Sequence, residues 1–418
     1  MFSNRELKEL VEKNRDKLLK LCCDLIRIPS VNPPGDTEEI VRYLCGYLKA
    51  HGVAYEVLRP TPETPDIVAR YGNPNGKKLI LNGHCDVVPV GDPKRWDFDP
   101  FSGEIRDGRI LGRGTSDMKC GLAGLIFAMC LLAENRVELD GEIILTVVPD
   151  EETFGDWGTK WLMESGTVTG DACLIGEPTG HDNCEIGQKG NASFRLTAEG
   201  TPAHGSLAPF VGENAIVKLL KVLTRVDEIR NIVPRYSDEV ARVMEESRQM
   251  AKKLIAGKGA WHVLNHCTVN IGTIQGGTKV NMVADHAEAE VDVRIPIGVT
   301  KEMVEEQLIR IMREADVGGV SYEFLYGAEA NSTDPKAQIV EAVAKNAEEV
   351  WKEKLSRTYQ WASSDARYFR YQGIPTLQYG PANLEGIHAY NETVDVEDVV
   401  NAAKVYIGAI TDFLNDPV

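Results

Sequence analysis

The sequence has no excess of positive charge. Its 46 lysines and arginines are outnumbered by 63 aspartates and glutamates, which gives a formal net charge of −17. Because nucleic-acid phosphates are bound by clustered lysine and arginine, this balance argues against a nucleic-acid partner. Bound cations would offset part of the negative charge.

Long apolar runs are also missing. The longest, GLAGLIFAMCLLA at 121–133, is shorter than the roughly 20 residues that a helix needs to cross a bilayer. The first twenty residues are charged from the fifth position and lack the apolar core of a signal peptide. We therefore expect no membrane partner and a cytoplasmic location, with leaderless export as the alternative.

Cysteine pairs with CxxC spacing are absent, as are internal repeats and low-complexity tracts. The nine cysteines, several of them in apolar runs such as DACLIG, are typical of reduced and mostly buried thiols. At 418 residues the chain is too long for one ordinary core, so two or three units are expected.

Helical and strand patterns alternate at both ends of the chain. Apolar residues recur at helical spacing over 5–27, until two prolines in IPSVNPPG end the helix. Short apolar strands that alternate with helices predict a sheet with helices on both faces. The expected strands are 66–71, 78–82, 142–148 and 375–380, and the further helices are 37–51, 119–134, 157–165, 335–352 and 396–414.

The middle of the chain has a different pattern. NASFRLTAEG, TVNIGTIQGG and AEAEVDVRIPIG alternate apolar and polar residues, as strands with one wet face do. A strand at VSYEFL and helices at 212–230, 236–257 and 301–316 accompany them. We predict an α/β domain of residues 1–188 and 330–418 with a mixed, mostly parallel sheet between helices, and an inserted α+β domain of residues 189–329 with an antiparallel sheet.

His84 and Asp86 follow the apolar strand KKLILNG. An imidazole with a carboxylate two residues on, on the same side of a strand, is typical of a metal ligand whose second ring nitrogen is supported. Asp117 lies 33 positions after His84, directly before a predicted helix. It is either an N-cap or a metal ligand, since a carboxylate has two oxygens and can bridge two ions.

Adjacent glutamates, Glu151 and Glu152, follow another apolar strand. Their mutual repulsion would raise one pKa unless a cation compensates. One of them can bind a metal while the other accepts a proton from water, and chemistry alone does not say which. Glu177, at the end of a third strand, and His388, in a late loop, are weak signals singly. In combination these clusters favour a hydrolytic di-metal site at the carboxyl ends of the strands.

The motifs GHCDVVP, GRGTSDMKCG, PDEE, IGEPT, PAHGS, GGTKVNMV, SSDARYF and GIHAYNE, in this order over nearly the whole chain, resemble those of the di-zinc metallopeptidase family that contains aminoacylase, carboxypeptidase G, acetylornithine deacetylase and succinyl-diaminopimelate desuccinylase. The resemblance implies a zinc-exopeptidase-like catalytic domain. It also implies His84 and Glu177 on one zinc, Glu152 and His388 on the other, Asp117 bridging both, Asp86 behind His84, and Glu151 as the general acid and base.

The same resemblance implies that the inserted domain is a lid and forms a homodimer. His204 would reach the neighbouring subunit's site and steady the oxyanion, although by itself it is only a polar residue beside a tight turn. Asn281 and Arg294 would hold the substrate, and an arginine fork suits a free carboxylate; a surface salt bridge is the alternative for Arg294. Ser363 and Ser364 would line the substrate pocket.

We therefore expect a hydrolase that cleaves an amide bond of a small, carboxylate-bearing substrate, with N-acetyl or N-succinyl amino acids favoured. The cofactor would be two zinc ions, with cobalt or manganese as alternatives. A dipeptidase or carboxypeptidase with the same metals is the second candidate. A non-catalytic protein that binds a small acid is the third, and an intact Glu151 argues against it.

Overall fold

The computed structural model describes residues 2–254 and 259–415. It divides into two compact units. Unit 1 comprises residues 1–186, 333–358 and 364–418, and unit 2 comprises residues 187–332 and 359–363. The expected helix at 236–257 runs partly outside the described residues. Within the described parts of the chain, every helix is too short or too polar to span a bilayer.

Unit 1 is built on a mixed sheet with the strand order β1-β2-β6-β3-β7-β15-β8. The neighbours β6, β3, β7 and β15 are parallel, whereas β1, β2 and β8 join antiparallel. The mixed, mostly parallel sheet predicted from the sequence is confirmed. Its strands are β1 (Ala54–Thr61), β2 (Thr64–Gly72), β3 (Lys78–His84), β6 (Glu142–Val148), β7 (Ala172–Ile175), β8 (Asn183–Gln188) and β15 (Thr376–Gln378), with β14 (Ser356–Gln360) paired to β8.

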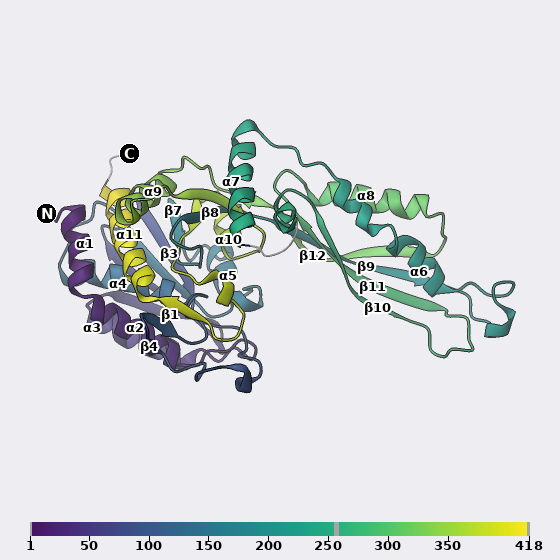
Figure 1. The fold of residues 1–418 in the computed structure, drawn as a ribbon, viewed down its shortest axis with the longest axis horizontal. Helices are drawn as coiled ribbons and strands as arrows, with labels where there is room; N and C mark the ends of the chain where they lie inside the picture. Colours follow the sequence, from purple (N-terminus) through teal and green to yellow (C-terminus); the bar gives the residue numbers. More distant parts are fainter. Residues whose placement is uncertain (1, 255–258, 416–418) are drawn as a thin grey trace. The chain divides into compact units, whose positions relative to one another are not determined.

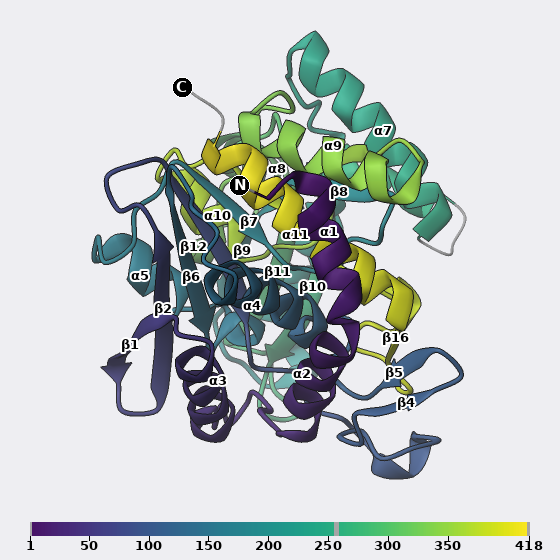
Figure 2. The ribbon, with the colours of Figure 1, turned by 90° about the vertical axis from the view of Figure 1, so that its left-hand side faces the viewer.

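Helices cover this sheet because their apolar faces need burial. Helix α4 (Lys119–Glu134) is buried almost all round and packs on β3, while α11 (Val396–Asn415) packs on α4. Figure 2 shows α1, α4 and α11 side by side. The remaining helices are α1 (Asn4–Lys13), α2 (Arg15–Arg27), α3 (Glu38–Ala50), α5 (Thr159–Glu164), α9 (Gln338–Trp351) and α10 (Ala366–Tyr371). A small antiparallel sheet, β16 (Thr393–Asp395), β5 (Arg109–Leu111) and β4 (Glu104–Arg106), completes the unit.

Unit 2 is an antiparallel sheet with the order β10-β11-β9-β12. Its inward-facing residues pack against helices α6 and α8, which lie along the sheet in Figure 1. The strands are β9 (Gly190–Glu199), β10 (Thr268–Gly276), β11 (His286–Ile295) and β12 (Val320–Ala328). The helices are α6 (Ala215–Leu223), α7 (Asp238–Leu254) and α8 (Lys301–Glu314), and the short strand β13 (Asn331–Ser332) pairs with Gly187 and Gln188.

Candidate metal centre

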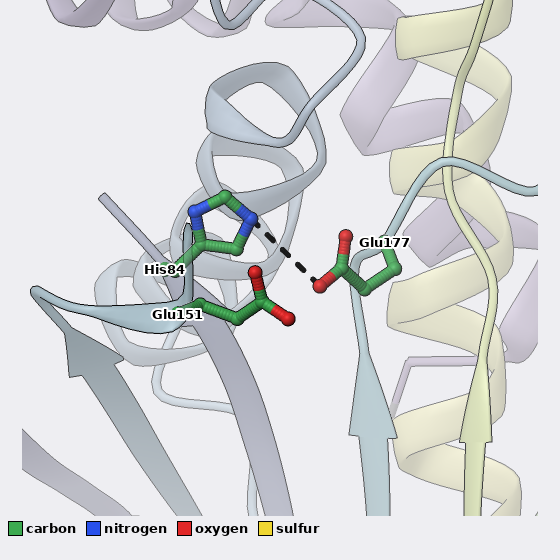
Figure 3. Close-up of side chains that lie close together, drawn as sticks. All are labelled: His84, Glu151 and Glu177. Carbon is green, nitrogen blue, oxygen red and sulfur yellow. Dashed lines mark ion pairs between the residues drawn. The ribbon is translucent and has the colours of Figure 1, made fainter. Parts of the chain in front are cut away.

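Three neighbouring parallel strands of unit 1 end at the same edge of the sheet. His84 is the last residue of β3, Glu151 begins the 3₁₀ turn that follows β6, and Glu177 stands two residues after β7. The carboxyl ends of parallel strands meet at one edge, so residues 93 positions apart in sequence come together there. Figure 3 shows these three side chains pointing toward one another.

His84 is buried and has carboxylates on both sides of its ring. Its Nε2 atom lies 3.2 Å from Asp117 Oδ1 and 3.8 Å from Glu177 Oε1. Its Nδ1 atom lies 3.4 Å from Asp86 Oδ1 and 3.0 Å from the backbone oxygen of the same residue. One ring nitrogen is therefore directed at the acidic cluster and the other is held from behind, as in a supported metal-binding imidazole.

Asp117 lies between two imidazoles. Its Oδ1 atom faces His84, and its Oδ2 atom is 3.3 Å from Nε2 of His388. Nε2 of His388 is also 3.3 Å from Glu152 Oε2. The two oxygens of Asp117 therefore face the two imidazoles separately.

Burial and hydrogen bonds shift the pKa values of the site residues. Burial raises the pKa of the Glu151 and Glu177 carboxyls well above their usual range, and His84 opposes this only in part. Burial also works against ionisation of Asp117, yet hydrogen bonds from His388 and His84 hold its pKa below the ordinary value. Hydrogen bonds to Asp117 and Glu152 raise the pKa of His388 to about 10.

These donors fit metal ions. The ligand atoms of His84, Glu151 and Glu177 lie within 4.8 Å of one another, and so do those of His84, Asp117 and Glu152. Oε1 of Glu152 is buried without a hydrogen-bond partner among the described residues. Cations between these groups would satisfy that oxygen and favour the deprotonated ligands. Imidazole and carboxylate donors in this number suit zinc and similar divalent ions.

Two residues predicted to act on the substrate, His204 and Asn281, lie in unit 2. His204 is exposed, and its Nδ1 atom is 2.8 Å from Ser206 Oγ. The backbone oxygen of Asn281 accepts a hydrogen bond from Gly205, and His204 forms an isolated β-bridge with Met282. The two predicted residues are therefore neighbours in space, although 77 positions separate them.

The other predicted substrate residues already have partners within their own units. In unit 2, Nε of Arg294 donates to Asp292 at 2.8 Å, and Gln188 donates to Ser363 Oγ at 3.1 Å. In unit 1, Ser364 is buried and its hydroxyl lies 3.1 Å from Gln378 Oε1. Their roles toward a substrate stay predictions.

Asn32 and Glu392 contact residues of the site and were not predicted from the sequence. Asn32 donates to Asp86 Oδ2 at 2.9 Å and to Thr153 at 3.0 Å. Glu392 accepts hydrogen bonds from the segment that carries Asp117. The only signal for Glu392 was its position four residues after His388 in GIHAYNE, and Asn32 had none beyond a loop with two prolines.

Comparisons with known proteins identify the family of the chain. Residues 80–412 match the model of Peptidase family M20/M25/M40. The chain is 29% identical to succinyl-diaminopimelate desuccinylase of Parvibaculum lavamentivorans, over 93% of each chain. It is also 29% identical to N-formyl-4-amino-5-aminomethyl-2-methylpyrimidine deformylase of Halalkalibacterium halodurans, over 99% of each.

Among solved structures, an M20 family metallo-carboxypeptidase from Sulfolobus solfataricus superposes with a TM-score of 0.76 at 21% identity, and the match covers 95% of this chain and 99% of that one. This likeness confirms the predicted fold class. The family match extends over the five predicted metal ligands, from His84 to His388, and over Glu151 and Asp86. The chain therefore belongs to Peptidase family M20/M25/M40 and is a metal-dependent hydrolase.

Proposed function

We propose that the protein removes an acyl group from the nitrogen of a small, carboxylate-bearing amide, with an N-acetyl or N-succinyl amino acid as the favoured substrate. The observation that carries the proposal is the pair of ligand groups that residues at the carboxyl ends of β6, β3 and β7 form, one of them together with Asp117 before α4. The two relatives at 29% identity support the acyl class, since their names describe removal of a succinyl and a formyl group.

We assign His84 and Glu177 to one ion, Glu152 and His388 to the other, and Asp117 to both. Of the two adjacent glutamates, Glu152 lies 3.3 Å from His388, which supports it as a ligand of the ion that His388 holds. Glu151 also lies among donors that could hold an ion, so its assignment as the base rests on the order of the two glutamates in the PDEE motif. Two bound zinc ions would polarise the substrate carbonyl and acidify water. Cobalt or manganese would serve the same donors.

Glu151 then carries the proton. Its carboxylate takes a proton from water as the water oxygen attacks the amide carbon, and it delivers that proton to the nitrogen when the C–N bond breaks. Burial raises the pKa of Glu151, which favours its uptake of a proton, and bound cations would oppose this rise. Asp86 holds the His84 ring in place during these steps.

We further propose that residues 1–188 and 330–418 act as the catalytic domain and residues 189–329 as a lid that also forms a homodimer. The edge strand β10 supports dimerisation because it is mostly exposed. Ile271 and Ile274 on it are 44% and 52% exposed, and Val217 on α6 is 51% exposed. Light scattering on the purified protein measures the mass directly, and a monomer at micromolar concentration would contradict the dimer.

His204 would serve the partner's site by donating to the developing oxyanion. Complementation tests this. When His204→Ala and Glu151→Gln chains are mixed and reassembled, action in trans restores one working site per mixed dimer, because one site combines an intact Glu151 with an intact His204. Action within one chain restores none.

The substrate class is tested with a panel of N-acetyl, N-succinyl and N-formyl compounds and dipeptides, assayed with zinc, cobalt or manganese. We expect the highest kcat/KM on an N-acyl amino acid, and a rise in KM for Arg294→Met if this arginine holds the carboxylate.

The fold is shared with a carboxypeptidase, so a dipeptidase or carboxypeptidase is the second candidate. Turnover of dipeptides alone would favour it. We propose a reducing compartment, the cytoplasm, because none of the nine cysteines, all of which lie within the described residues, is in a disulfide.

A further inference from the structure

Glu392 is a fully buried carboxylate that uses both of its oxygens. Oε1 accepts hydrogen bonds from the backbone N–H groups of Ser116, at 2.9 Å, and Asp117, at 3.2 Å. Oε2 accepts from the backbone N–H of Gly114, at 3.1 Å, and from the guanidinium of Arg113, at 2.6 Å. A carboxylate has about four acceptor positions, so this one segment, residues 113–117, takes all of them.

The contacts of Glu392 join two parts of the chain that carry metal-site residues. The backbone N–H of Asp117 donates a hydrogen bond to the Glu392 carboxylate, and His388 stands four positions before Glu392 in the sequence. The side chains of Asp117 and His388 meet at 3.3 Å. The main chain of His388 has a φ of 57°, in the left-handed region that few non-glycine residues adopt. A residue in such a conformation needs the surrounding structure to hold it there.

Further hydrogen bonds connect the segment before Asp117 to the segment around His388. Ser116 Oγ donates to the backbone oxygen of Thr393 at 3.1 Å and accepts from the backbone N–H of Asn383 at 2.9 Å. The backbone N–H of Gly112 donates a hydrogen bond to the backbone oxygen of Glu392 at 3.0 Å. The segments around Asp117 and His388 are therefore fastened by main-chain contacts, with the Glu392 carboxylate at the centre.

We infer that Glu392 is a positioning residue of the dinuclear site, whose carboxylate fixes the main chain of Asp117 against the His388 segment so that both side chains face the ion that they share. This rests on the proposed metal centre. Glu392 touches neither substrate nor metal in this role. A purely structural role, as the partner of Arg113 in a buried ion pair, is the competing explanation.

The test compares Glu392→Gln with Glu142→Gln. A glutamine has one acceptor oxygen, so its amino group would face either the N–H groups of Ser116 and Asp117 or the guanidinium of Arg113. Glu142 is a matched control because it is also buried and paired to an arginine, Arg70 at 3.3 Å, but it begins β6 at the end away from Glu151.

Chelator-treated proteins are titrated with Co²⁺, and visible absorption reports both the number of bound ions and the geometry of their ligands. We expect Glu392→Gln to bind one of two ions at least 10-fold more weakly than the wild type, with altered absorption bands. Glu142→Gln should match the wild type in both. If Glu392→Gln is not recovered folded, Glu392→Asp, which keeps the charge but is one methylene shorter, takes its place with the same expectation.

Unchanged metal affinity and absorption in the Glu392 variant would overturn the inference about Glu392 but leave the proposed dinuclear site standing. Equal weakening in Glu142→Gln would also overturn it, because the effect would then follow general stability. A wild-type protein that binds fewer than two ions would instead overturn the proposed dinuclear site, and the inference with it.

Discussion

The backbone N–H of Glu152 donates a hydrogen bond to the carboxylate of Asp86, at 3.3 Å. The other oxygen of Asp86 lies 3.4 Å from Nδ1 of His84. One buried carboxylate therefore contacts both the imidazole at the end of β3 and the turn after β6. Asn32, which donates to the same carboxylate, holds it from a third segment.

Asp86→Ala should weaken metal binding and hydrolysis together. Loss of the partner behind a metal-binding histidine typically costs about 10- to 100-fold in affinity, and here the Glu152 turn loses its support as well. Competitive metal titration measures the effect. Asp92→Ala is the control, because Asp92 is an exposed aspartate on the loop that follows. Equal metal affinity in the two variants would contradict the support role of Asp86.

The sequence predicted the central strands well because they are buried on both faces and appear as continuous apolar runs. β1 was missed, since AYEVLRPT lies at the sheet edge and is largely exposed. The helix expected at 5–27 is interrupted at Asn14, which ends α1 and precedes α2. Its side chain donates to the backbone oxygen of Leu10, a local contact that an apolar pattern does not reveal.

The candidate site was predictable to the extent that its residues end strands. His84, Glu151 and Glu177 stand where apolar runs stop, and parallel strands bring such positions together. The residues that hold the site were not predictable in this way. Glu392 contacts a segment about 275 positions earlier, and only the folded chain shows that the two meet.

Gly121→Ala should destabilise the protein near the site. A Cβ at this position of α4 would lie 1.9 Å from the backbone oxygen of Gly176, next to Glu177. Backbone has to shift to admit it, which costs about 1–3 kcal/mol. Urea unfolding measures the change.

A glycine on an open helix face gives the matched control. Around Gly46 in α3, no neighbouring atom lies within 4 Å of the place that a Cβ would take, so Gly46→Ala should stabilise by about 1 kcal/mol through helix propensity. The same sign of change in both variants would contradict the close approach of α4 to Gly176.

Asp66 makes folding depend on pH. It is buried, neither oxygen has a hydrogen-bond partner among the described residues, and desolvation raises its pKa to about 9. Between about pH 4 and pH 9 the folded protein holds a proton that the unfolded chain has released, so this residue lowers stability as pH rises through that window.

Asp66→Asn should therefore gain stability over the wild type, with a gain that is absent below pH 4 and grows up to pH 9. Urea midpoints at pH 4, 7 and 9 show the trend. Asp140→Asn, which alters an exposed carboxylate of the same unit, should show no such trend. A gain for Asp66→Asn that does not vary with pH would rule out the buried, protonated carboxyl.

Glu151 is proposed to transfer the proton, and five other residues are proposed to hold the ions: His84, Asp117, Glu152, Glu177 and His388. This assignment is tested most directly by measuring metal content and kcat of Glu151→Gln on the best substrate of the panel. We expect the variant to bind two ions as the wild type does, with kcat lower by about 100- to 10,000-fold. Wild-type kcat in this variant with full metal content would contradict the account.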